Sequence, residues 1–430
     1  MTRPTRHLHL AALAAALGMM TAMTARAATP SFEDFDRRAR EGERLSIVFF
    51  GASLTWGANA SDPQQTSYRA LVARRLEEAY PKAHFRFHDA AIGGTGSQLG
   101  VFRFDRDVLA RGPDLVFLDF SANDDIYSDN PETLASYESL VRRTILDARA
   151  PIVQVIFPFL WNVKSGSTDG MKRRDAHLEI ARAYGAPVGD AIALAIERTK
   201  SGATTLERLW PVDGVHPCDE GYVLFADAAW SAFQGAVKAK RVCAAPEKML
   251  HAPTYMKHAR VRVSSLAPLP AGWRAGRPNV VSAYFDMLMS RWLDDETIAS
   301  RTVERTDAAG KKSRKPQDVA PLRVRFRGSM VMLYGESTMA SARFRARIDG
   351  KAMECRPDKN KPAVDFFDAG DLGRRLKGNT FLVAVIAEGL DPAAEHTLDI
   401  EPIWGDGLDE ELRIESICVA GGEARVMRAD

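Results

Sequence analysis

Short apolar runs alternate with amphipathic stretches between residue 45 and residue 240. The apolar runs predict buried strands, and the stretches between them, where apolar residues recur three and four positions apart, predict helices. Strands are predicted at 46–50, 84–89, 115–120, 152–157 and 187–189. Helices are predicted at 67–79, 100–110, 132–148, 171–184 and 219–240. This alternation predicts an α/β domain whose parallel sheet is covered by helices on both faces.

The pattern changes in the second half of the chain. Residues 244–270 contain four prolines and no clear period, which is typical of a boundary between domains. Beyond them, short runs rich in Val, Ile and Phe alternate with arginine, and turn signals such as Asp349-Gly350 separate them. The runs lie at 322–326, 330–334, 341–348, 380–387, 396–400 and 411–419. They predict an antiparallel, jelly-roll-like β-sandwich.

A chain of 430 residues exceeds what one hydrophobic core usually organises, so two domains are expected. We predict a signal peptide at 1–27, the α/β domain at 28–245, a linker at 246–270 and an accessory β-sandwich domain at 271–430. Two arginines, an apolar segment and the sequence Ala25-Arg26-Ala27 indicate the signal peptide and its cleavage site. The apolar segment is shorter than the roughly 20 residues that span a bilayer. We therefore expect an exported protein, periplasmic or secreted, without a membrane span.

The formal net charge of +2 depends mostly on the predicted signal peptide. That segment carries three arginines and no acid, so the formal charge falls to about −1 without it. This charge gives no reason to expect a nucleic-acid partner. The basic stretch at 304–318 is interpreted as a solvated loop rather than an anion-binding patch. The oligomeric state is left open.

Four cysteines are present, at 218, 243, 355 and 418. Export to an oxidising compartment permits disulfides. A continuous helix over 219–240 would hold Cys218 and Cys243 about 30 Å apart, which is too far for a bond. A pairing of Cys355 with Cys418 stays open. No spacing of histidines and cysteines suggests a metal site, and no cofactor is expected.

A serine follows the first predicted strand directly, in the run Gly51-Ala52-Ser53-Leu54. About 160 residues downstream, Asp213-Gly214-Val215-His216 places a carboxylate and an imidazole on one short loop, and Pro217 disfavours a helix at His216. Serine, histidine and carboxylate are the groups that nucleophilic acyl transfer requires. Either run alone would also suit an ordinary turn or a surface histidine. The interpretation therefore depends on what lies between them.

Two more runs lie at strand ends, Ile92-Gly93-Gly94-Thr95 after the second strand and Ser121-Ala122-Asn123-Asp124 after the third. The carboxyl ends of parallel strands meet at one edge of a sheet. A glycine there lets a backbone N–H approach a ligand closely, and an asparagine offers a neutral N–H₂ donor. Such donors stabilise the oxyanion of acyl transfer. The acids that follow, Asp124, Asp125 and Asp129, are interpreted as a solvated loop rather than a cation site.

These four runs resemble, in order, the four motif blocks of the SGNH (GDSL-type) hydrolases. The resemblance covers about residues 44–240 and implies a flavodoxin-like three-layer α/β/α fold. It implies Ser53 as the nucleophile, His216 as the base and Asp213 as the group that orients the base. It further implies an oxyanion hole made by the backbone N–H groups of Ser53 and Gly94 and the side chain of Asn123. The G-x-S-x-G elbow of α/β-hydrolases is absent around Ser53.

Two residues depart from the family pattern. Ala52 stands where the family signature has an aspartate, which puts the geometry of the nucleophile turn in question. Ser121 replaces the glycine that usually stands two residues before the asparagine, which would narrow the space beside the oxyanion hole. Neither change removes a group with a catalytic role.

Two tryptophans lie close to these motifs in the sequence, Trp56 after the nucleophile and Trp161 after the fourth strand. An aromatic ring near the serine suits stacking against a sugar, although packing beneath a loop explains it equally well. The leading hypothesis is an exported esterase that removes small acyl groups, acetyl above all, from carbohydrate. The C-terminal region resembles the galactose-binding-like β-sandwiches of secreted enzymes. The alternatives are a short-chain lipase or thioesterase-like esterase, a polysaccharide O-acetyltransferase, and a glycan-binding protein with a vestigial site.

Overall fold

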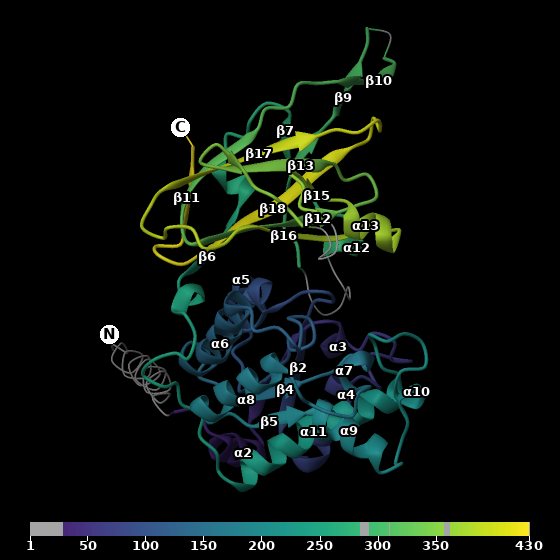
Figure 1. Ribbon diagram of the computed structural model, residues 1–430, viewed down its shortest axis with the longest axis vertical. Coiled ribbons are helices and arrows are strands. Elements are labelled where there is room, and N and C mark those ends of the chain that lie inside the picture. The colour runs from purple at the N-terminus through teal and green to yellow at the C-terminus, as the bar shows by residue number, and fades with distance from the viewer. Residues whose placement is uncertain (1–28, 284–291, 309, 357–361, 430) are drawn as a thin grey trace, which may run out of the picture.

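The computed structural model describes residues 29–283, 292–308, 310–356 and 362–429. The predicted signal peptide at 1–27 lies outside these residues. The described chain forms two stacked domains, one with helices around a parallel sheet and one made of antiparallel sheets (Figure 1). Among the described residues, no helix combines the length and the apolar character needed to cross a bilayer.

The first domain is built on a five-stranded parallel sheet in the order β2-β1-β3-β4-β5. Its strands, in chain order, are β1 Arg44–Gly51, β2 His84–Ala91, β3 Leu115–Leu118, β4 Ile152–Ile156 and β5 Val188–Asp190. This is the flavodoxin-like strand order. Strands β3 and β4 are buried along their whole length because helices cover both faces of the sheet. The predicted α/β/α fold is confirmed.

The helices of the first domain include all five that the pattern predicts, with ends shifted by a few residues. They are α2 Phe32–Arg40, α3 Ser53–Trp56, α4 Tyr68–Ala79, α5 Ser97–Asp107, α6 Pro131–Leu146, α7 Leu160–Val163, α8 Lys172–Tyr184, α9 Ala191–Lys200, α10 Leu206–Leu209 and α11 Asp219–Lys238. Short 3₁₀ turns lie at η1 Leu109–Arg111, η2 Pro253–Met256 and η3 Val263–Leu266. The prediction missed α2, α9 and the four-residue helices α3, α7 and α10. In α2, Phe32, Phe35 and Ala39 are buried, and Ser31 caps the first turn.

The second domain is an antiparallel β-sandwich, as predicted. One sheet has the order β14-β13-β17-β11-β19, with β15 also paired to β13, and the other has the order β16-β12-β18-β8-β7, with β6 also paired to β18. In chain order the strands are β6 His258–Arg262, β7 Trp273–Gly276, β8 Glu296–Ser300, β11 Leu322–Arg327, β12 Met330–Ser337, β13 Arg343–Ile348, β14 Lys351–Ala352, β15 Phe367–Asp368, β16 Thr380–Ala387, β17 His396–Ile403, β18 Glu411–Ala420 and β19 Arg425–Arg428. Two short helices, α12 Val280–Ala283 and α13 Asp371–Leu376, lie between strands.

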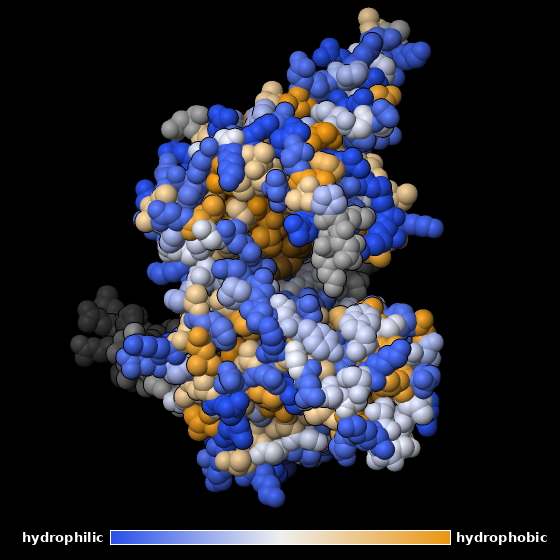
Figure 2. Space-filling model, viewed as in Figure 1, coloured by the Kyte–Doolittle hydropathy of each residue, from blue (hydrophilic) through white to orange (hydrophobic). Residues whose placement is uncertain are grey.

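Two predictions for the second half of the chain are wrong in part, and the open question of a disulfide is answered. Residues 304–318 are not a loop, because β9 Thr302–Thr306 and β10 Lys312–Pro316 form an exposed antiparallel hairpin. This hairpin projects from the far end of the sandwich and is largely hydrophilic (Figure 2). Within the predicted linker, residues 258–262 form strand β6, which pairs with β18. All four cysteines are free, so the Cys355–Cys418 disulfide is not formed.

The two domains share one hydrophobic core. Side chains from the sheet of β16, β12 and β18 belong to the same buried cluster as the strands and helices of the first domain. They are Met330, Met332, Tyr334, Phe381, Cys418 and Ala420. The residues between the two sheets of the sandwich form a second cluster. The outer face of one sheet is therefore buried against the first domain, which fixes the relative position of the domains.

A buried acid follows β3 at the edge where the functional residues gather. Asp119 is 1% exposed. Its Oδ1 accepts hydrogen bonds from the backbone N–H and the hydroxyl of Ser121, at 3.1 and 3.0 Å. Its Oδ2 has no hydrogen-bond partner among the described groups. Burial raises the pKa of Asp119 to about 7, because a charged carboxylate would lose its hydration there.

This carboxyl makes the stability of the fold depend on pH. The unfolded chain releases the proton near the ordinary pKa of 3.8, and the folded chain holds it to about 7, so stability is lost as the pH rises between these values. Asn at this position keeps an oxygen acceptor for Ser121 and does not titrate. We expect Asp119→Asn to gain stability over the wild type by up to about 1.4 kcal/mol for each pH unit in that window. Thermal unfolding from pH 4 to pH 7 measures it, and parallel curves for the two proteins would contradict the assignment.

Candidate active site

The structure brings the predicted serine, histidine and aspartate together. The Nε2 atom of His216 lies 3.0 Å from the Oγ atom of Ser53. The other ring nitrogen, Nδ1, lies 3.5 Å from Oδ2 of Asp213. The first distance is that of a hydrogen bond, and the second is longer, as is common for catalytic pairs without a bound substrate. A serine, an imidazole and a carboxylate in this order can transfer a proton from the serine hydroxyl to the histidine.

The local fold places Ser53 directly at the end of β1. Ala52 lies in the extended region, with φ −118° and ψ −152°, and its carbonyl accepts the N–H groups of Thr55 and Trp56. Ser53 is therefore the first residue of α3, and its N–H has no acceptor within the helix. The turn needs no aspartate at position 52, because Ala52 is fully buried in an ordinary conformation.

The Asp213 carboxylate is held by the loop that carries His216. Its Oδ1 accepts the backbone N–H groups of Val215 and His216, both at 2.7 Å. Its Oδ2 accepts the side-chain amide of Asn59 at 2.8 Å. Partial burial alone would raise the pKa of Asp213, but these three hydrogen bonds bring it below its ordinary value. Asp213 is therefore ionised and fixed when it faces the imidazole.

No motif in the sequence points to a role for Asn59. This residue is exposed and has a φ of +66°, a conformation that asparagine tolerates better than most side chains. It follows the nucleophile helix by three residues and reaches a carboxylate 154 positions further along the chain. Asn59 thus joins the turn of Ser53 to the loop of Asp213.

The glycine run lies at the end of β2, in the turn before α5. Gly94 has a φ of +75°, which favours glycine, and the hydroxyl of Thr95 closes the turn by donating to the carbonyl of Ile92 at 2.7 Å. A Cβ added to Gly94 would lie 3.8 Å from the ring of Phe381, which belongs to β16 of the second domain. The second domain therefore borders the turn that was predicted to supply an oxyanion donor.

Asn123 is half-buried at the same edge, in the loop after β3. Two residues before it, Ser121 is fully buried, and its Oγ accepts the N–H of Phe157 at 2.9 Å. This hydroxyl is thus engaged at the ends of β3 and β4, where it ties the two strands together. The narrowing beside the oxyanion hole that Ser121 was predicted to cause stays a prediction.

The acidic run after Asn123 was predicted to be a solvated loop, and this is wrong for Asp124. Asp124 is buried, accepts the N–H of Ser97 at 3.0 Å and so fixes the start of α5. Burial raises the pKa of Asp124 to about 6. Asp125 is exposed, and Asp129 pairs with Lys172 at 2.7 Å. Within the described ranges, no cluster of acids, histidines and cysteines has the form of a metal site.

The two tryptophans differ in their surroundings. Trp161, in α7, is 50% exposed and lies against the loop of the histidine, because a Cβ on Gly214 would come within 3.4 Å of its ring. The backbone N–H of Leu160 also donates to the carbonyl of Gly214 at 2.8 Å. Trp56 ends α3 and is half-buried. Of the two tryptophans, Trp161 therefore has the more exposed ring, and that ring lies beside the histidine loop.

Comparison with known proteins agrees with this fold. A "two-domain esterase (CEX) active on acetylated mannans", solved with mannopentaose, is 22% identical, covers 92% of this chain and 97% of its own, and superposes with a TM-score of 0.67. Another structure with the same description superposes with a TM-score of 0.65 at 22% identity, over 91% of this chain and 95% of its own. Acetylxylan esterase from Geobacillus stearothermophilus is 23% identical over 206 residues, which cover 44% of this chain and 92% of that protein.

The sequence model of the GDSL-like Lipase/Acylhydrolase family matches residues 49–224. This range contains the serine, the glycine turn, the asparagine loop and the histidine loop. Residues 49–224 therefore form a domain of the GDSL-like lipase/acylhydrolase (SGNH) family, and the chain is accordingly a hydrolase of carboxylic esters.

Proposed function

We propose that this protein is an exported esterase that removes acetyl or similarly small acyl groups from carbohydrate. The contact of 3.0 Å between His216 and Ser53 carries the proposal, because it gives the serine a base at the edge where Gly94 and Asn123 also lie. The names of the similar proteins, which act on acetylated xylan and mannan, support the carbohydrate substrate. Export rests on residues 1–27, whose sequence is that of a signal peptide.

In the first half of the proposed reaction, Ser53 Oγ attacks the ester carbonyl and His216 Nε2 takes the hydroxyl proton. The backbone N–H groups of Ser53 and Gly94 and the Asn123 amide stabilise the oxyanion, and each donor contributes about 10²- to 10³-fold in rate. The intermediate collapses to acyl-Ser53 as His216 returns the proton to the departing sugar hydroxyl. Water then attacks the acyl group while His216 accepts its proton, and the carboxylic acid leaves as Ser53 regains its hydrogen.

The surroundings of Ser53 also bear on the substrate. Trp161 offers an exposed ring beside the histidine loop, which suits stacking on a sugar. Phe381 of the sandwich lies beside Gly94, so a carbohydrate chain that extends from Ser53 would meet both domains. The resemblance of the sandwich to galactose-binding-like modules stays a prediction.

A substrate screen tests the function. We expect the purified protein to release acetate from acetylated polysaccharides and to hydrolyse 4-nitrophenyl acetate, and Ser53→Ala to lose about 10⁴-fold or more in kcat. Activity that peaks on acyl chains longer than about eight carbons would favour a lipase, which a deeper apolar site would serve. Transfer of acetyl to added sugar without hydrolysis would favour an acetyltransferase. Unchanged hydrolysis in Ser53→Ala would contradict the proposal.

Trp161→Ala tests whether the ring of Trp161 binds the sugar of the substrate. Loss of the ring removes a stacking surface and leaves the triad in place, so KM should rise for an acetylated oligosaccharide and not for 4-nitrophenyl acetate. An equal change for both substrates would count against a sugar platform at this position.

Asn59 provides a test of the triad itself. Asn59→Gly keeps the backbone conformation, because glycine adopts a positive φ freely, and removes the hydrogen bond to Asp213 together with a longer one, of 3.4 Å, to the carbonyl of His216. We expect kcat for 4-nitrophenyl acetate to fall about 2- to 12-fold with little change in KM, the value of one hydrogen bond. Asn59→Asp would place two carboxylates side by side and raise their pKa, so its activity should fall more steeply toward low pH. Wild-type kinetics in both variants would show that Asn59 does not orient Asp213.

A further inference from the structure

A single buried arginine joins the two strand ends that carry Ser53 and Gly94. Arg103 lies in α5, and its side chain is 1% exposed. Its Nη2 donates to the carbonyl of Gly51 at 2.8 Å, and its Nη1 donates to the carbonyl of Ala90 at 2.5 Å. Gly51 is the last residue of β1, two residues before the nucleophile. Ala90 is the residue before the last of β2, four residues before Gly94. The fork of one guanidinium therefore fixes both turns relative to each other.

The turn at Gly51 is closely packed, and its carbonyl also accepts the N–H of Ile92 at 3.1 Å, so Arg103 adds to a backbone connection between the two strand ends. A Cβ at Gly51 would lie 2.2 Å from Thr55 Oγ1 and 2.6 Å from the carbonyl of Asp119. Arg103 also lies over the ring of Phe50, with its guanidinium carbon 4.3 Å from the ring centroid. In such a close-packed site, a displacement of the guanidinium is passed on to the turn rather than absorbed.

The charge of Arg103 is balanced by a residue on its own helix. Asp107 Oδ2 lies 3.1 Å from Nη1 of Arg103, and the Asp107 side chain is 5% exposed. Oδ1 of the same carboxylate accepts Nε of Arg106 at 2.7 Å. Asp107 thus joins two arginines. Removal of either arginine changes how firmly the carboxylate holds the other, because a buried charge needs its partner.

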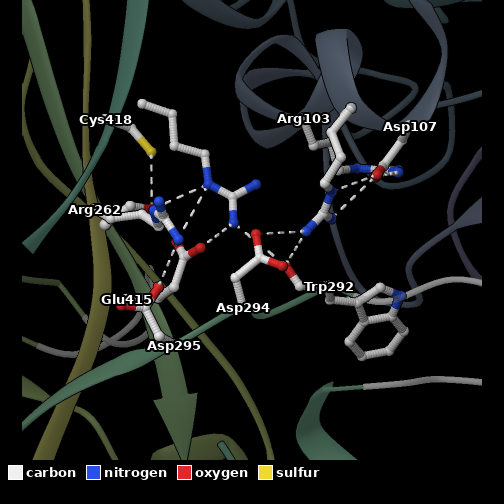
Figure 3. A network of polar contacts seen from close by, with 11 residues as sticks. Arg103, Asp107, Arg262, Trp292, Asp294, Asp295, Glu415 and Cys418 are labelled. Atoms are coloured by element: carbon white, nitrogen blue, oxygen red, sulfur yellow. Dashed lines mark hydrogen bonds and ion pairs between the residues drawn. The ribbon is translucent and has the colours of Figure 1, made fainter. Parts of the chain in front are cut away.

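Arg106 connects this group to the second domain. Its Nη1 donates to the carbonyl of Trp292 at 2.7 Å and lies 3.8 Å from Asp294. Residues 292 to 295 lead into β8 of the sandwich. Figure 3 shows Trp292 and Asp294 facing the group of Arg103 and Asp107 across the domain boundary. The contact from Trp292 to Gly51 is thus continuous through two arginines and one aspartate.

The second domain in turn holds this segment firmly. Arg260 of β6 donates to the same Trp292 carbonyl at 3.2 Å and pairs with Glu415 of β18 at 2.7 Å. Arg262 pairs with Asp295 at 3.2 Å (Figure 3). The ring of Trp292 packs edge-on against Phe381, with 5.6 Å between centroids. The segment is therefore tied to β6 and β18 by its backbone and to the neighbourhood of Gly94 by its side chain.

We propose that Arg103 is a positioning residue for the nucleophile and oxyanion turns, and that the second domain keeps it in place through Arg106 and Asp107. The proposal rests on the proposed esterase function and gives the sandwich a part in catalysis that needs no glycan binding. Arg103 touches neither substrate nor the reacting atoms. It acts through the carbonyls of Gly51 and Ala90.

The test uses the whole chain and the hydrolysis of 4-nitrophenyl acetate. Arg106→Gln removes the hydrogen bond to Trp292 and the ion pair with Asp107 without substituting Arg103 or Asp107. Arg103 then loses its support from the second domain, so we expect kcat to fall about 2- to 30-fold with little change in KM. Arg103→Lys keeps the charge but replaces the two-nitrogen fork by a single nitrogen that does not match the spacing of the two carbonyl bonds, and we expect a loss of about 10²-fold, as for a misplaced catalytic group. The rate at which a small fluorophosphonate modifies Ser53 should fall in parallel, because it needs the same serine and the same oxyanion donors.

Asp105→Asn is the matched control. Asp105 lies on the same helix and pairs with Arg143 and with His258 of β6, the latter at 3.5 Å, and among the described residues its carboxylate forms no ion pair with Arg103 or Arg106. We expect its kcat to equal that of the wild type. Assays well below each variant's unfolding temperature separate misplacement of the turns from loss of folded protein.

A double-mutant cycle tests the connection itself. If Arg106 acts through Arg103, the loss in Arg106→Gln combined with Arg103→Lys should be smaller than the product of the single losses. A wild-type kcat in Arg106→Gln, an equal loss in Asp105→Asn, or losses that multiply would overturn the proposal. A wild-type protein that hydrolyses no ester would instead overturn the proposed function, so the two failures are distinguishable.

Discussion

The carboxyl ends of β1 and β3 approach each other at Gly51 so closely that no side chain fits between them. A Cβ at Gly51 would lie 2.6 Å from the carbonyl of Asp119 and closer still to Thr55. The chain must therefore leave the sheet at this point in one conformation, which makes Ser53 the first residue of α3. The positions of His216, Gly94 and Asn123 matter only because the serine they serve is fixed.

Most of the polar side chains at this edge of the sheet form hydrogen bonds that fix the turns, and one, Asp119, is a buried carboxyl with a raised pKa. Asp124 caps α5, Ser121 joins the ends of β3 and β4, and Arg103 joins the ends of β1 and β2. Asp119 is buried with one oxygen unpartnered among the described groups. The fold thus bears unfavourable burial at the site that carries the chemistry, a pattern common at functional sites.

Local patterns in the sequence were enough to predict the parallel sheet and the residues of the triad. Apolar runs located the five parallel strands, and the spacing of Asp213 and His216 suited one loop. Residues whose role depends on distant contacts could not be found in this way. Asn59 reaches Asp213 across 154 positions, and Arg103 looks like any arginine on an amphipathic helix. Strand β6 could not be predicted from its own proline-rich segment, because it is stabilised by pairing with β18, about 155 residues away.

The account depends on Ser53 becoming acylated. The most direct measurement is rapid quenching of the protein during turnover of an activated acetate ester, followed by mass spectrometry of the peptides. The account predicts a single acetyl group on the peptide that contains Ser53, and accumulation of that species when a slow substrate limits deacylation. Turnover with no acetyl group on Ser53, or with the group on another residue, would contradict it.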